Sequence, residues 1–243
     1  MTLKIGSSIT GGFRRIANRN GAVLLGAFTL LAIVWQVTFT SFFLDIALGD
    51  GAAVSSLTIP PMIDAPTTVL AAGALLSILA LTYLNIVAIR TFVSGATRSI
   101  PSDYFTRRIG VVFLNTVVGG IVFGLLVFLG SILLIIPGII AYVAFIFTTF
   151  YIAVEDENFV AALRHSWTLT RGNWLKLFGL LLIVIVGFGA ISTAISLAAT
   201  AAGQPIETVV TSVVSLAVTV VTLGILSEAF NQLRAGAGST TPA

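Results

Sequence analysis

Residues 111–154 read VVFLNTVVGGIVFGLLVFLGSILLIIPGIIAYVAFIFTTFYIAV, 44 consecutive residues without a charged side chain. As one α-helix this stretch would be about 66 Å long at 1.5 Å per residue, whereas the hydrocarbon core of a bilayer is about 30 Å thick. The chain must therefore turn back inside the stretch. Gly130 with Ser131 and Pro137 with Gly138 are the two places where a helix could break. We predict a tight hairpin of two spans, in which Pro137 and Gly138 have a structural role.

The whole chain has the composition of a membrane protein. Of its 243 residues, 57% are hydrophobic and 9% are charged, against about 45–50% and about 25% in soluble domains. Mean hydropathy is +1.10. A chain this apolar has more apolar surface than a soluble core of its size could bury. The chain has no cysteine, which excludes a disulfide scaffold, a thiolate nucleophile and a cysteine-ligated metal.

Other uncharged stretches are also long enough to cross a bilayer. Together with the first one they predict an all-α integral membrane bundle of six transmembrane helices, arranged as three hairpins within residues 21–234. The predicted spans are 22–44, 67–89, 111–130, 132–154, 177–202 and 208–227. Residues 235–243 are predicted to be a disordered tail.

All 12 basic residues fall on one side of this six-span frame. They lie before the first span, between the second and third, between the fourth and fifth, and after the sixth, whereas the opposite loops carry only acidic charges. Because basic residues accumulate on the cytoplasmic side, the pattern predicts a multi-pass protein of the cytoplasmic (cell) membrane with its N- and C-termini in the cytoplasm.

Two cytoplasmic segments are predicted to be amphipathic interfacial helices. In residues 1–20, apolar and basic side chains occupy opposite sides of a helical wheel, which suits anionic headgroups. The basic residues that face the headgroups there are Arg14, Arg15 and Arg19.

The second interfacial helix is predicted over residues 157–171. Trp167 lies on its apolar face, Arg164 and Arg171 border that face, and Trp174 follows the helix. Long basic side chains and tryptophans favour the membrane interface. This helix is either an anchor that sets tilt and depth or a surface that docks a partner or a lipid headgroup.

Residues 137–178 read PGIIAYVAFIFTTFYIAVEDENFVAALRHSWTLTRGNWLKLF. This pattern resembles a broad group of prokaryotic polytopic membrane proteins of unknown function, which includes YciC-like proteins and the membrane domain attached to some glycerophosphodiester phosphodiesterases. Ten arginines against two lysines are similar to haloarchaeal members. The resemblance implies a membrane module and no active site, because no part of the soluble catalytic domain is present. The matching residues are Pro137, Gly138, Ile139, Ala162, Ser166, Trp167, Arg171 and Gly172.

Side chains suited to catalysis are few. His165 is the only histidine, whereas a zinc site needs several histidine, cysteine or carboxylate ligands. The acidic run 155–157 is typical of a helix start, where the dipole favours negative charge. We therefore expect no catalytic residue, no metal, no cofactor and no enzymatic activity. Nucleic-acid binding is not expected either, because the basic clusters lie at the membrane face.

The sequence favours a scaffold or accessory protein that binds membrane lipids, or a membrane or cytoplasmic protein partner, at the cytoplasmic face. The alternative is a transporter or pore for a small or lipidic substrate, which a polar cavity reaching Gln36, Asn85 or Asn115 would support. Gly120 and Gly124 form a small-residue stripe that serves close helix packing inside the monomer or, alternatively, a homo-oligomer. The residues expected to bind the partner or lipid are Arg164, Trp167, Arg171, Trp174, Arg14, Arg15 and Arg19.

Overall fold

The computed structural model describes residues 3–48, 63–200 and 204–238, and these residues form helices with no strand among them. Six of the helical segments are long and apolar enough to cross a membrane, which confirms an all-helical, multi-pass architecture. The predicted loop between the first two spans, residues 45–66, lies largely outside the described residues. The helices are α1 (Ile5–Ile16), α2 (Arg19–Leu48), α3 (Thr67–Ser94), α4 (Asp103–Thr106), α5 (Ile109–Leu133), α6 (Ile135–Phe145), α7 (Thr148–Glu155), α8 (Phe159–Thr170), α9 (Trp174–Thr200) and α10 (Gln204–Gly238).

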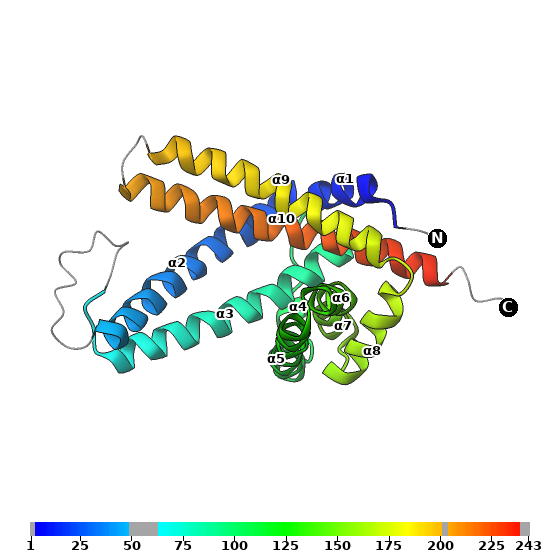
Figure 1. The fold of residues 1–243 in the computed structure, drawn as a ribbon, viewed down its shortest axis with the longest axis horizontal. Helices are drawn as coiled ribbons and strands as arrows, with labels where there is room; N and C mark the ends of the chain where they lie inside the picture. Colours follow the sequence, from blue (N-terminus) through cyan, green and yellow to red (C-terminus); the bar gives the residue numbers. More distant parts are fainter. Residues whose placement is uncertain (1–2, 49–62, 201–203, 239–243) are drawn as a thin grey trace.

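The last helix is the centre of the arrangement. Helix α10 packs against α1, α2, α3 and α9, while α2 also packs against α3 (Figure 1). The core sits where α10 meets α3 and α7, around the fully buried rings of Phe92, Phe147 and Phe230. The Phe147 and Phe230 ring centroids are 5.5 Å apart. The helices therefore converge near the basic ends of the spans, which is where the candidate sites lie.

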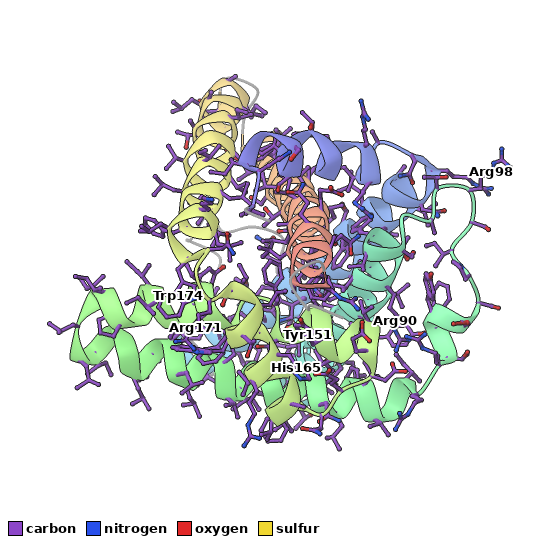
Figure 2. The ribbon with its side chains drawn as sticks, turned by 90° about the vertical axis from the view of Figure 1, so that its right-hand side faces the viewer. Arg90, Arg98, Tyr151, His165, Arg171 and Trp174 are labelled. Atoms are coloured by element: carbon purple, nitrogen blue, oxygen red, sulfur yellow. The ribbon has the colours of Figure 1, made fainter. Side chains whose placement is uncertain are left out.

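The long uncharged stretch turns at Leu134, between the two candidate positions. Leu134 is extended (φ −160°, ψ 144°) and separates α5 from α6. Gly130 and Gly138 face one another across the turn, since a Cβ on Gly130 would lie 3.0 Å from the Gly138 Cα. Pro137 is in the first turn of α6, where a missing N–H costs no helical hydrogen bond. In Figure 2 the pair α5 and α6 runs across the direction of α9.

The fourth span is a broken helix rather than a continuous one. Helix α6 ends at Phe145 and α7 begins at Thr148, so the backbone at the break needs other hydrogen-bond partners. The Ser166 hydroxyl of α8 donates to the Ala144 carbonyl (2.8 Å) and accepts from the Phe147 N–H (3.2 Å). Helix α8 is thus bonded to the span beside it through a buried serine.

Helix α1 packs on α10 through its smallest residues. A Cβ on Gly12 would lie 2.5 Å from the Ile225 Cα, and a Cβ on Gly224 would lie 3.0 Å from the Gly12 carbonyl oxygen. Ser8 is also buried in this contact. Gly11 and Gly12, which lower the intrinsic helix propensity of α1, therefore lie against α10, whereas a Cβ on Gly6 would meet nothing within 4 Å.

Two predictions need correction. Gly120 and Gly124 do not pack inside the monomer, because a Cβ on either would meet nothing within 4 Å among the described residues; the residue of α5 that packs closely is Gly119, beside Ile152 and Phe159. The predicted disordered tail begins too early, because α10 continues through Gly238. Adding residues to the end of an existing helix costs little, because the unfavourable step is nucleation and α10 is already formed. Residues 239–243 lie outside the described part of the chain.

Candidate partner and lipid interface

The structure divides the basic residues into two sets. Four of them form ion pairs with carboxylates: Arg15, Arg90, Arg107 and Arg234. Unpaired guanidinium and ammonium groups remain available to anions, and the second set contains four of the five predicted interface arginines, all except Arg15. Within the part of the chain that the structure describes, the residues without an ion pair are Lys4, Arg14, Arg19, Arg98, Arg108, Arg164, Arg171 and Lys176.

Four of the predicted interface residues gather where α8 turns into α9. The rings of Trp167 and Trp174 meet edge to face with centroids 5.0 Å apart, and Trp174 Nε1 donates to the Thr170 hydroxyl (3.2 Å). Arg164 and Arg171 are exposed, and Trp167 is 39% exposed. Figure 2 shows Arg171 beside Trp174 at this turn. We call Arg164, Trp167, Arg171 and Trp174 the basic aromatic corner.

Local sequence explains how this corner is positioned. The Asn158 side chain caps α8 by accepting a hydrogen bond from the Ala161 N–H (2.9 Å). One face of α8, made of Ala162, Ser166 and Thr170, is fully buried against α6 and its neighbours. Gly172 has φ +83°, a left-handed conformation that favours glycine. Helix α8 packs on the bundle through this face of small residues. Arg164, Arg171 and Trp167 therefore stay on its exposed side.

The three predicted N-terminal residues have different surroundings. Arg14 and Arg19 are exposed, whereas Arg15 forms an ion pair with Glu228 of α10 (2.7 Å). Arg15 also donates to the carbonyls of Phe92 and Val93, the latter at 3.1 Å. Arg15 therefore connects α1 to α10 and to the end of α3. Of the three predicted N-terminal residues, only Arg14 and Arg19 are free of an ion pair and can bind an external anion.

A buried arginine, which the sequence marks only as a membrane-flanking charge, lies at the basic ends of the spans. Arg90 is 3% exposed, and its guanidinium donates to the carbonyls of Ala153 (2.6 Å), Tyr104 (2.9 Å) and Arg107 (3.1 Å) and to Asp156 (2.9 Å). Figure 2 shows Arg90 among the helices and Arg98 pointing outward. The available signal was that the apolar residues Phe92 and Val93 follow Arg90 before α3 ends at Ser94.

A second cluster surrounds an open pocket of about 310 Å³ between α7, α8 and the end of α10. His165 Nδ1 lies 2.7 Å from the Glu157 carboxylate, and Arg234 pairs with Glu155 at 2.6 Å. The Tyr151 ring packs against His165, with centroids 5.4 Å apart. These polar groups are already paired with one another, so the cluster ties α10 to the segment before α8. No group of three or more metal-ligating side chains occurs among the described residues.

The fold and these clusters define a polytopic α-helical membrane protein with a basic, partly aromatic face at one end of its spans. The family model described as a domain of unknown function (DUF7847) matches residues 3–233, so the chain belongs to this family. Neither curated proteins nor solved structures give a match to the chain. The likeness to YciC-like and haloarchaeal proteins stays a prediction.

Proposed function

We propose that the protein is a non-enzymatic scaffold or accessory protein of the cytoplasmic membrane, which binds an anionic lipid headgroup or a protein partner at its cytoplasmic face. In this proposal the six spans form three hairpins, both termini are cytoplasmic, and α1 and α8 lie at the inner interface. The observation that carries it is the basic aromatic corner, where exposed, unpaired arginines flank a tryptophan pair.

The chemistry of the corner suits a negatively charged partner at the depth of the headgroups. Tryptophan is enriched at the membrane interface because one side of its ring is apolar and its N–H is polar. Each cation near an anionic membrane surface contributes about 1 kcal/mol. Arg164 and Arg171 have no carboxylate partner among the described residues, so an incoming anion displaces no internal ion pair.

The test is purification of the full chain from its host in mild detergent, followed by mass spectrometry of bound proteins and lipids. The variant Arg164→Glu with Arg171→Glu should lose the co-purifying partner or lipid and keep its membrane insertion. The matched control is Arg98→Glu with Arg108→Glu, which reverses two exposed, unpaired arginines elsewhere and should retain binding. Unchanged binding in the first variant would refute the assignment of this corner.

The transporter or pore alternative gains no specific support from the pockets described. Neither of them is lined by Gln36, Asn85 or Asn115. Asn115 has an internal role, since its Oδ1 accepts a hydrogen bond from the Phe159 N–H (3.0 Å) at the start of α8. A homo-oligomer is tested by the same purification, because a second copy would appear in the measured mass of the complex.

A further inference from the structure

A groove of about 590 Å³ runs between α1, α2 and α10, a volume within the range of ligand sites, roughly 300–1,000 Å³. Nine of its eleven lining residues have no polar side chain, among them Phe13, Leu25 and Val220. The two polar ones, Asn18 and Arg19, are neighbours at the turn between α1 and α2. The groove is therefore amphipathic: its walls are apolar, and its one cation, Arg19, lies at that turn.

Small residues keep the groove open. Ala22 and Ala217 line it from α2 and α10, and Gly21 lines it where the chain turns. A Cβ on Gly21 would lie 2.0 Å from the Ile16 carbonyl oxygen, so the turn requires glycine there. The contact of Gly12 with α10 brings α1 close enough to form the third wall.

The charges around the groove favour an anion at its polar end. Glu228, the acid nearest to this part of α1, is held by two contacts from Arg15, at 2.7 and 2.8 Å. The Asn18 amide is occupied as well, because it donates to the Arg15 carbonyl (2.6 Å) and accepts from the Gly21 N–H (3.1 Å). Arg19 is exposed and has no ion pair in the described residues. No acidic residue lines the groove.

We propose that this groove holds one acyl chain of an anionic membrane lipid, with the lipid headgroup against Arg19. The inference deepens the proposed function and rests on it, since it names a ligand class at the N-terminal part of the predicted cytoplasmic face. An amphiphile with a negative headgroup matches both the apolar walls and the single unpaired cation. A zwitterionic lipid of the same chains matches the walls alone, and a soluble phosphate matches Arg19 alone.

The experiment is native mass spectrometry of the full chain in mild detergent, titrated with dioleoyl phosphatidylglycerol or dioleoyl phosphatidylcholine. We expect one phosphatidylglycerol to bind more tightly than phosphatidylcholine, and glycerol 3-phosphate alone not to compete. Arg19→Gln should weaken phosphatidylglycerol binding about fivefold, to the level of phosphatidylcholine, because it removes one cation at the headgroup. Arg98→Gln is the matched control, an exposed and unpaired arginine that does not line the groove.

The apolar walls are tested by filling the groove. Ala22→Trp and Ala17→Phe place a large side chain in the groove from exposed lining positions, so the fold should tolerate them. Two variants are made so that the test survives if one of them does not fold. Both should weaken phosphatidylglycerol and phosphatidylcholine binding alike. Equal binding of the two lipids to the native chain, or unchanged binding after filling, would overturn the proposal. The corner variant Arg164→Glu with Arg171→Glu, measured in parallel, separates a failure of this groove from a failure of the proposed function.

Discussion

The Ser166 hydroxyl on α8 donates a 2.8 Å hydrogen bond to the Ala144 carbonyl at the end of α6. The same oxygen accepts from the Phe147 N–H (3.2 Å), so one side chain binds a backbone group on each side of the break in the fourth span; the Thr170 hydroxyl also donates to the Ala144 carbonyl (3.2 Å). In a span, such groups have no water to bind. These bonds fix α8 to the membrane bundle. They therefore also set the position of the basic aromatic corner, which lies on α8 and the start of α9.

Ser166→Ala should lower the free energy of unfolding by about 1–3 kcal/mol, because it leaves a buried backbone N–H without a partner. The measurement is denaturant unfolding in mixed micelles. Thr168→Ala is the control, since Thr168 is exposed and its hydroxyl bonds only to the Arg164 carbonyl of its own helix. Equal stability of the two variants would show that the Ser166 hydroxyl does not support the break.

Arg90→Ala should be more damaging, with a loss on the order of 3–5 kcal/mol, because it removes a buried cation that three backbone carbonyls and Asp156 bind. Asp156 then keeps only the exposed Arg107 as an ion partner, at 3.3 Å. Arg98→Ala removes an exposed arginine near the end of the same helix and should change stability by less than about 0.5 kcal/mol. The free energy of unfolding of both variants is measured under identical detergent conditions, and a similar small effect in both would contradict the central role of Arg90.

A double-mutant cycle with Asp156, the ion partner of Arg90, measures how strongly the two residues are coupled. Asp156 has φ +55°, a conformation that asparagine also tolerates, so Asp156→Asn removes the charge without backbone strain. In the native chain Arg90→Ala leaves Asp156 with Arg107 (3.3 Å) as its one remaining ion partner among the described residues. Once residue 156 is neutral, Arg90→Ala no longer costs an anion its buried partner. Its cost should therefore be smaller in the Asp156→Asn background than in the native chain. Strict additivity of the two changes would show that they are not coupled.

Most of the fold could be predicted from the sequence because helix spans are local. The length of an uncharged stretch sets the bounds of a span, and the first five described spans begin and end within five residues of the expected positions. The sixth differs, because α10 continues to Gly238, 11 residues past the expected end at residue 227. The turn at Leu134 could only be bracketed, since glycines stand on both sides of it and face one another across it. Arg90 and Arg98 look alike in sequence. Only tertiary partners, such as the Ala153 carbonyl 63 residues away and Asp156, distinguish the buried arginine from the exposed one.

Two of the three glycines of α1, Gly6 and Gly12, predict effects of opposite sign. Gly6→Ala should stabilise the protein by up to about 1 kcal/mol, since alanine favours a helix and a Cβ there meets nothing within 4 Å. Gly12→Ala should destabilise it by about 1–3 kcal/mol through overpacking, because the added Cβ would lie 2.5 Å from the Ile225 Cα. Thermal unfolding followed by circular dichroism reports both. Stabilisation by both variants would mean that α1 does not dock on α10.

The absence of cysteine from the chain permits a direct test of the membrane topology. A single cysteine reacts with an impermeant maleimide only where water reaches it, because the thiolate is the reactive form. In intact cells Ser56→Cys, in the predicted outer loop, should be labelled, whereas Ser99→Cys, in a predicted cytoplasmic segment, should be labelled only after permeabilisation.

Leu134→Cys addresses the tip of the α5–α6 pair in the same experiment. Leu134 is 68% exposed in the isolated chain, and Leu133 and Ile135 beside it are more exposed still. Such an apolar turn is stable only where hydrocarbon covers it, so we expect no labelling before or after permeabilisation. Labelling of Ser99→Cys in intact cells would overturn the orientation of the termini. Labelling of Leu134→Cys from outside would show instead that the orientation holds and that the tip emerges into water.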